Sequence, residues 1–130
     1  MLKILKGSLL FLMIILFSLP VFPCICEILS VRKAKKLASV VFVGKAVEVY
    51  GRRARFEVKT FWKGAAGKEI IVYEEANDCS FHFTVDKEYL VYAYTSEESG
   101  HLQTNFCSRT SILSGASDDI KRLGKGKPPQ

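Results

Sequence analysis

The hydrophobic positions divide this chain into an apolar N-terminal segment and a longer region with regular repeats. Lys3 and Lys6 precede an unbroken apolar run from Leu9 to Phe17, and a proline-containing segment follows it. A basic start, a short apolar run and a proline-broken exit are typical of a secretory signal peptide. A membrane anchor needs about 20 apolar residues, so we interpret residues 1–23 as a signal peptide.

A helical repeat opens the mature chain and a strand repeat follows it. In Val31–Ala38 the apolar residues lie three or four positions apart, and Ser30 precedes them as a candidate N-cap. The period then changes to two, which predicts a strand over Val40–Val49 with Gly44 as a bulge or a site of close approach. The other face of the helix is basic, with Arg32, Lys33, Lys35 and Lys36.

Alternation predicts further strands, and a final helical segment closes the pattern. In the next strand we expect Phe56, Val58 and Trp62 to share one face. Asp118–Leu123 predicts a short helix, and residues 125–130 are expected to form a flexible basic tail. The expected strands are Arg55–Trp62, Glu69–Glu74, Phe81–Val85, Tyr89–Thr95 and Leu102–Cys107.

Five or six short strands between two short helices favour a mainly β domain of the α+β class, spanning residues 24–124. A five- to six-stranded OB-type closed barrel suits this length. The N-terminal segment with Cys24 and Cys26 would then be a strap fastened to the barrel by disulfides.

Composition agrees with one small globular domain. The chain has 130 residues, of which 48% are hydrophobic and 25% are charged, and its formal net charge is +6. These values exclude a disordered or collagen-like chain and a multidomain enzyme. A basic patch could bind an anionic polymer or an envelope surface, although charge runs are more often simply solvated. Its candidate residues are Arg52, Arg53 and Arg55 at a turn and Lys33 and Lys36 on the first helix, with Lys35, Lys121, Arg122, Lys125 and Lys127 as further cations.

The four cysteines predict a disulfide framework, as expected for an even number in an exported chain. Cys24 and Cys26 are two apart, so a ring between them would be strained and each should bond a distant partner. Two pairings remain open, Cys24–Cys79 with Cys26–Cys107 or Cys24–Cys107 with Cys26–Cys79. The C-x-C spacing is not typical of zinc ligands, so we expect no intrinsic metal and no cofactor.

The sequence offers no catalytic constellation. It contains no G-x-S-x-G, H-E-x-x-H or P-loop motif. His82 alternates with apolar neighbours and is interpreted as an exposed strand residue, and bridged cysteines provide no nucleophile. We therefore expect no enzymatic activity. OB barrels also bind single-stranded nucleic acid, but export argues against that partner, and we expect Tyr92 and Phe106 in the core.

Several short motifs occur in a fixed order along the mature chain. They are Cys24-Ile25-Cys26, the strand at 38–45, Phe61-Trp62-Lys63-Gly64, the isolated Cys79, Tyr89-Leu90-Val91-Tyr92-Ala93, Cys107-Ser108-Arg109-Thr110 and Ala116…Asp119-Ile120…Leu123. In this order the chain resembles the netrin-like domain, specifically the N-terminal domain of the tissue inhibitors of metalloproteinases and their short bacterial relatives. The resemblance implies an OB-type barrel and the pairing Cys24–Cys79 with Cys26–Cys107.

The resemblance also implies a function, the inhibition of a zinc metalloproteinase. In that family the N-terminal cysteine, here Cys24, binds the protease's catalytic zinc through its α-amine and carbonyl oxygen. An α-amine titrates near about 8, so a neutral lone pair is accessible. The resemblance places Ile25 in the protease's primary specificity pocket. It places Asn77 and Asp78 on the flank of the N-terminal segment, which the disulfide of Cys26 helps to hold rigid.

The position of signal-peptide cleavage decides whether Cys24 has a free amine. Cleavage after Pro23 would expose it, whereas cleavage after Ser18 would leave extra residues that block chelation. The alternative function is a non-inhibitory binding or structural module, for example one that binds polyanions. In either case we expect a monomer that is secreted, periplasmic or extracellular.

Overall fold

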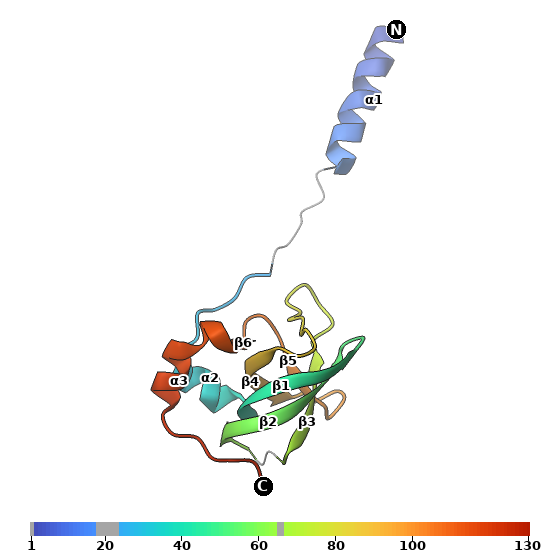
Figure 1. Cartoon of the computed structure of the whole chain (residues 1–130). Helices are drawn as coiled ribbons and strands as arrows, with labels where there is room; N and C mark the ends of the chain where they lie inside the picture. Colours follow the sequence, from blue (N-terminus) through green and yellow to red (C-terminus); the bar gives the residue numbers. More distant parts are fainter. Residues whose placement is uncertain (1, 18–23, 65–66) are drawn as a thin grey trace.

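The computed structural model describes residues 2–17, 24–64 and 67–130 (Figure 1). The first element, α1 (Leu2–Phe17), is a helix with exposed apolar side chains; Leu9 and Phe11 are each 67% exposed. Within the described ranges, none of the helices has the length and apolar character needed to cross a membrane. The predicted exit of the signal peptide, 18–23, lies outside the described residues.

Residues 40–112 form a closed barrel of five strands with one extra strand at its side. In the barrel β1 pairs with β2, β2 with β3, β3 with β5, β5 with β4, and β4 returns to β1. The β3–β5 pair is parallel and the others are antiparallel. This is the predicted mainly β OB-type barrel. The strands are β1 (Val40–Tyr50), β2 (Arg53–Lys63), β3 (Glu69–Glu74), β4 (Glu88–Thr95), β5 (Leu102–Thr104) and, outside the barrel, β6 (Ser111–Ile112).

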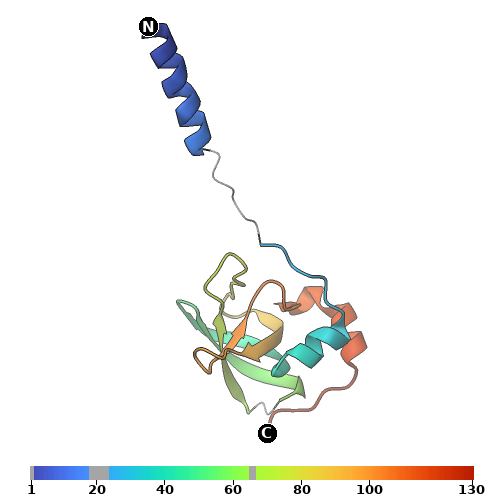
Figure 2. The ribbon, with the colours of Figure 1, turned by 180° about the vertical axis from the view of Figure 1, so that it is seen from behind.

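Short helices cover one side of the barrel. Helix α2 (Val31–Leu37) lies beside α3 (Ser117–Leu123), which follows the single turn η1 (Leu113–Gly115) (Figures 1 and 2). Ser30 is the predicted N-cap, because its hydroxyl oxygen accepts the backbone N–H of Lys33 at 3.1 Å. The last carbonyls of α2 accept hydrogen bonds from the ammonium group of Lys63, a favourable place for a cation.

The apolar side chains form two layers on opposite faces of the same strands. Even-numbered residues at the start of β1, such as Phe42, point into the barrel, while odd-numbered ones, such as Val41, face the helices. Strand β4 is divided in the same way between Val91 inside and Tyr92 outside. The first half of β1 and most of β4 are therefore buried on both faces, which explains their nearly continuous apolar sequence.

Gly44 is both a bulge site and a site of close approach. Val43 pairs with Thr60 but Gly44 pairs with Val58, so β2 carries one extra residue at this point. A Cβ atom on Gly44 would lie only 2.9 Å from the carbonyl oxygen of Glu57. Glycine is therefore needed here for space.

The same bulge overturns one predicted face. Trp62 packs against the layer under the helices, whereas Phe56 and Val58 lie inside the barrel. The extra residue reverses the alternation, so Phe61 takes the inward position instead. The prediction that Trp62 shares a face with Phe56 and Val58 is therefore wrong.

The segment after α3 is attached to β2. The indole N–H of Trp62 donates to the carbonyl oxygen of Gly124 at 2.9 Å. Lys127 exchanges two backbone hydrogen bonds with Phe61, at 2.8 and 2.9 Å. We expected residues 125–130 to be a flexible tail, but at Lys127 these contacts hold it against the barrel.

The predicted strand Phe81–Val85 is not formed. These residues belong to a loop between β3 and β4, and the rings of Phe81 and Phe83 contact Tyr89 at centroid distances of 5.9 and 4.9 Å. The alternation in the sequence reflects inward rings on a loop, which imitate the period of a strand.

Candidate functional site

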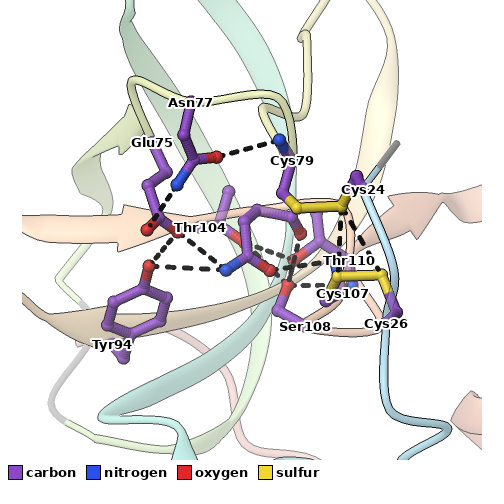
Figure 3. Close-up of a disulfide and its surroundings, with 11 residues drawn as sticks. Cys24, Cys26, Glu75, Asn77, Cys79, Tyr94, Thr104, Cys107, Ser108 and Thr110 are labelled. Atoms are coloured by element: carbon purple, nitrogen blue, oxygen red, sulfur yellow. Dashed lines mark hydrogen bonds between the residues drawn. A yellow bond between two sulfur atoms is a disulfide. The ribbon is translucent and has the colours of Figure 1, made fainter. Parts of the chain in front are cut away.

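The strap, defined as residues 24–30, is bonded to the barrel at two points. Cys24 is joined to Cys79 and Cys26 to Cys107, with Cα–Cα distances of 5.2 and 5.1 Å (Figure 3). This is the pairing implied by the resemblance, and it excludes the other pairing left open above. The two bridges are close neighbours, since the Sγ atoms of Cys24 and Cys107 are 3.6 Å apart.

The sulfur cluster is not a metal site. The Sγ atoms of Cys24, Cys26 and Cys107 lie within 4.8 Å of one another, as they would around a metal ion. All of them are in disulfides, and a bridged sulfur is not a thiolate ligand. Among the residues described here, no other group of three His, Cys, Asp or Glu residues is arranged as closely.

The strap presents apolar side chains to solvent. Ile25, between the two bridged cysteines, is 85% exposed, and Ile28 is 95% exposed. Leu29 is fixed from the other side, because its carbonyl oxygen accepts a hydrogen bond from the Arg109 guanidinium at 2.7 Å. The exposed positions are therefore held in place from both ends of the strap.

Arg109 is itself anchored by an acidic residue of α3. Its guanidinium donates to both carboxylate oxygens of Asp119, and the Tyr92 hydroxyl donates to the same carboxylate at 2.8 Å. Burial raises the pKa of Asp119, but the hydrogen bonds from Arg109 and Tyr92 outweigh it and leave the pKa lowered. The strap, β4 and α3 are thus joined through one ion pair.

The side chain of Asn77 forms hydrogen bonds within its own loop. Its side-chain oxygen accepts the backbone N–H of Cys79 at 2.9 Å, and its amide nitrogen donates to Glu75 Oε1 at 2.9 Å. Both ends of this side chain are thus used within the protein. Asp78, the other residue expected beside the strap, is exposed.

Asn105 repeats this arrangement in the loop after β5. Its side-chain oxygen accepts the backbone N–H of Cys107 at 2.9 Å, and its amide nitrogen donates to Glu75 Oε2 at 2.7 Å. This turn ends β5 at Thr104, so the predicted strand to Cys107 is too long. The repeated N-x-C sequence is a local signal for both turns, and the alternation of apolar residues does not reveal it.

Phe106 was predicted to lie in the core, but it lies at the surface. Its side chain is 66% exposed, and its backbone N–H donates to the carbonyl oxygen of Cys79 at 2.6 Å. Tyr92, by contrast, is buried as expected. Phe106 precedes a bridged cysteine, so the turn and not hydrophobicity decides its position.

The basic residues do not form the single patch considered above. The turn that carries Arg52, Arg53 and Arg55 lies at the far end of β1 from α2 (Figure 1). Arg53 and Arg55 are paired with glutamates of neighbouring strands, and Lys33 is paired with Glu27. Lys36 is exposed on α2, away from that turn.

A different cationic surface lies between α2 and α3. A groove of about 610 Å³ there is lined by Arg32, Lys35 and Arg122, together with Ser30 and two apolar residues. No carboxylate is among these lining residues, although Arg122 is paired with Asp118 at 3.0 Å.

The two histidines have separate surroundings. His82 is exposed, as predicted, but it lies in a loop, with Nδ1 3.0 Å from the buried carboxylate of Glu74. The ring of His101 contacts that of Tyr73 at a centroid distance of 4.5 Å.

No protein-family model matches this chain, and no curated protein matches it. What the chain does must therefore be inferred from the strap, the loops bonded to it and the resemblance described above.

Proposed function

We propose that this chain is an exported inhibitor of zinc metalloproteinases of the tissue-inhibitor type, acting through Cys24 after removal of residues 1–23. The observation that carries the proposal is the strap, where Ile25 is 85% exposed between two cysteines that are each bonded to the barrel. A rigid segment loses little conformational entropy when it docks. The two disulfides also fit an exported protein.

The chemistry of the proposal uses the main chain of Cys24. A catalytic zinc in such a protease has three protein ligands and a water molecule. The α-amine and carbonyl oxygen of one residue can both bind the metal, and they would displace the water that serves as nucleophile. Because an α-amine has a pKa of about 8, part of the population is unprotonated at neutral pH.

The neighbouring side chains would add contacts on either side of the zinc. Ile25 is an apolar side chain of suitable size for a specificity pocket, and Asp78 is exposed in the loop bonded to Cys24. Asn77 contributes indirectly, since both ends of its side chain hold that loop.

A matched pair of proteins tests the proposal. One begins at Cys24, and the control carries a single alanine before Cys24, which moves the amine while leaving the disulfides intact. We expect the first to inhibit a zinc endopeptidase and the control to lose at least about 100-fold in affinity, because metal coordination contributes several kcal/mol. Equal inhibition by both proteins would refute chelation by Cys24.

The same assay separates the proposal from its alternative. If neither protein inhibits any member of a panel of zinc proteases at micromolar concentration, the barrel is better described as a non-inhibitory binding module. N-terminal sequencing of the naturally exported protein is the companion measurement, with Cys24 as the expected first residue. A chain that begins upstream would exclude zinc chelation.

A second candidate function is binding of an anionic polymer at the groove between α2 and α3. The specific observation is that Arg32, Lys35 and Arg122 line this groove without a carboxylate among the lining residues. We expect salt-dependent retention on a heparin-like resin, with earlier elution for Arg32→Ala/Lys35→Ala. Arg53→Ala/Arg55→Ala is the matched control, because it removes the same number of cations and both residues are paired with glutamates. Unchanged elution of the double variant would refute this site.

A further inference from the structure

The two loops bonded to the strap are built on the same three-residue pattern. Each has an asparagine two positions before its bridged cysteine, in Asn77-Asp78-Cys79 and Asn105-Phe106-Cys107. In each, the asparagine oxygen accepts the cysteine N–H at 2.9 Å. These local turns fix the direction in which the middle residue leaves the backbone.

One carboxylate joins the two turns. Glu75 Oε1 accepts from Asn77, while Oε2 accepts from Asn105 and from the hydroxyl of Tyr94 on β4 (Figure 3). Hydrogen bonds to an ionised carboxylate are stronger than those between neutral groups. Glu75 follows β3 directly, and its own N–H donates to the carbonyl oxygen of Thr104 at 3.0 Å. The network therefore ties both loops to the barrel.

The ionised form of Glu75 is the one favoured by these contacts. Partial burial raises the pKa of this carboxyl, but hydrogen bonds from Tyr94, Asn105 and Asn77 outweigh it and leave the pKa lowered. At neutral pH Glu75 is thus an acceptor with both oxygens engaged.

The middle residues of the three bridged segments are all exposed. They are Ile25 between Cys24 and Cys26, Asp78 before Cys79 and Phe106 before Cys107. Each is one residue from a cysteine of the same pair of neighbouring disulfides. The Phe106 N–H also donates to Cys79, which links the two loops directly. The backbone of Phe106 is thus fixed next to a cysteine that is bonded to the strap, and its ring is exposed; aromatic side chains of this kind are enriched at protein interfaces.

We propose that Ile25, Asp78 and Phe106 form one contact edge, in which Phe106 is a specificity-determining contact and Glu75 is the residue that positions it. This rests on the proposed inhibitory function. A matching target would offer an apolar depression for Phe106 and a basic or polar group opposite Asp78.

A double-mutant cycle tests the positioning role in the protein that begins at Cys24. We expect Phe106→Ala and Glu75→Gln each to weaken inhibition by about tenfold, and the double variant to be no weaker than Phe106→Ala alone. Glu98→Gln, at an exposed glutamate in the turn between β4 and β5, is the charge-matched control and should have no effect. If the two effects multiply, Glu75 acts independently of Phe106 and the positioning role is wrong.

Amide hydrogen exchange tests the network without any protease. Glu75→Gln should speed exchange of the Cys79 and Cys107 N–H groups by about tenfold, since their acceptors lose an anchor. Tyr94→Phe removes one donor to Glu75 but keeps the carboxylate, and should give a smaller change in the same direction. If the protein that begins at Cys24 inhibits no protease, the proposed function fails, whereas unchanged exchange in both variants would overturn the positioning role itself.

Discussion

Removal of the Cys26–Cys107 bridge should reduce stability by less than its position in the chain suggests. Taken alone, this bridge spans a sequence separation of 81, which the chain-entropy model values at about 4.5 kcal/mol. Cys24 is two residues away and is already bonded to Cys79. In an unfolded chain that keeps this first bridge, the second closes a compound loop of only about 30 residues, which is worth about 3.5 kcal/mol.

The matched variant removes the Cys24–Cys79 bridge and keeps the Cys26–Cys107 bridge. Cys24→Ala/Cys79→Ala removes a bridge with a separation of 55, but the loop that remains to be closed has again about 30 residues. Cys26→Ala/Cys107→Ala and Cys24→Ala/Cys79→Ala should therefore each lower the free energy of unfolding by about 3.5 kcal/mol.

Urea unfolding at equilibrium measures these costs, with intact mass used to confirm the remaining disulfide. The slope of the transition must be compared as well, because a change in slope would report a different unfolded state. A difference of more than about 1.5 kcal/mol between the two variants, or a cost near zero for either, would show that loop closure does not control the stability contributed by the bridges.

Three further predictions follow from single contacts. Gly44→Ala should destabilise the barrel by about 2 kcal/mol in the same unfolding assay, because a Cβ would lie 2.9 Å from a carbonyl of β2; an unchanged midpoint would contradict this steric reading. Asp119→Asn should cost about 2 kcal/mol at pH 7 by breaking the pair with Arg109. Because folding lowers the pKa of Asp119, this carboxylate stabilises the fold above about pH 4, and the stabilisation is lost as the pH falls through the folded-state pKa. The melting temperature of Asp119→Asn should therefore vary less between pH 4 and 2 than that of the natural protein. Trp62→Phe removes the hydrogen bond to Gly124, so the free energy of unfolding should fall by about 1 kcal/mol and amide exchange at Lys127 should become faster. Unaltered exchange at Lys127 would show that other contacts hold the segment after α3.

Much of the barrel could be predicted from local pattern. The apolar run Tyr89–Thr95 predicted a central strand, and β4 does pair with β1, β5 and β6. Ser30 marked the start of α2, and Gly44 marked a bulge. Such features depend on the backbone geometry of a few consecutive residues, which the sequence displays directly.

Pattern failed where the same period has more than one cause. The rings of Phe81 and Phe83 alternate because they point into the core from a loop, and no strand is formed there. In β2 the alternation holds from Phe56 to Val58, and the bulge that follows places Trp62 on the opposite face. In the first case the alternation is kept without strand pairing, and in the second the pairing of β2 with β1 introduces a bulge that reverses it.

The sequence by itself determined the order of the two short helices and of five of the strands, and the need for cross-links between distant cysteines. Only the tertiary structure decided that Glu75 would meet Asn77 and Asn105 at once, and that Phe106 would lie beside the strap and not in the core. The physical reason is range: a strand's period is set within a few residues, whereas these meetings require β3 to pair with β5 and the barrel to close.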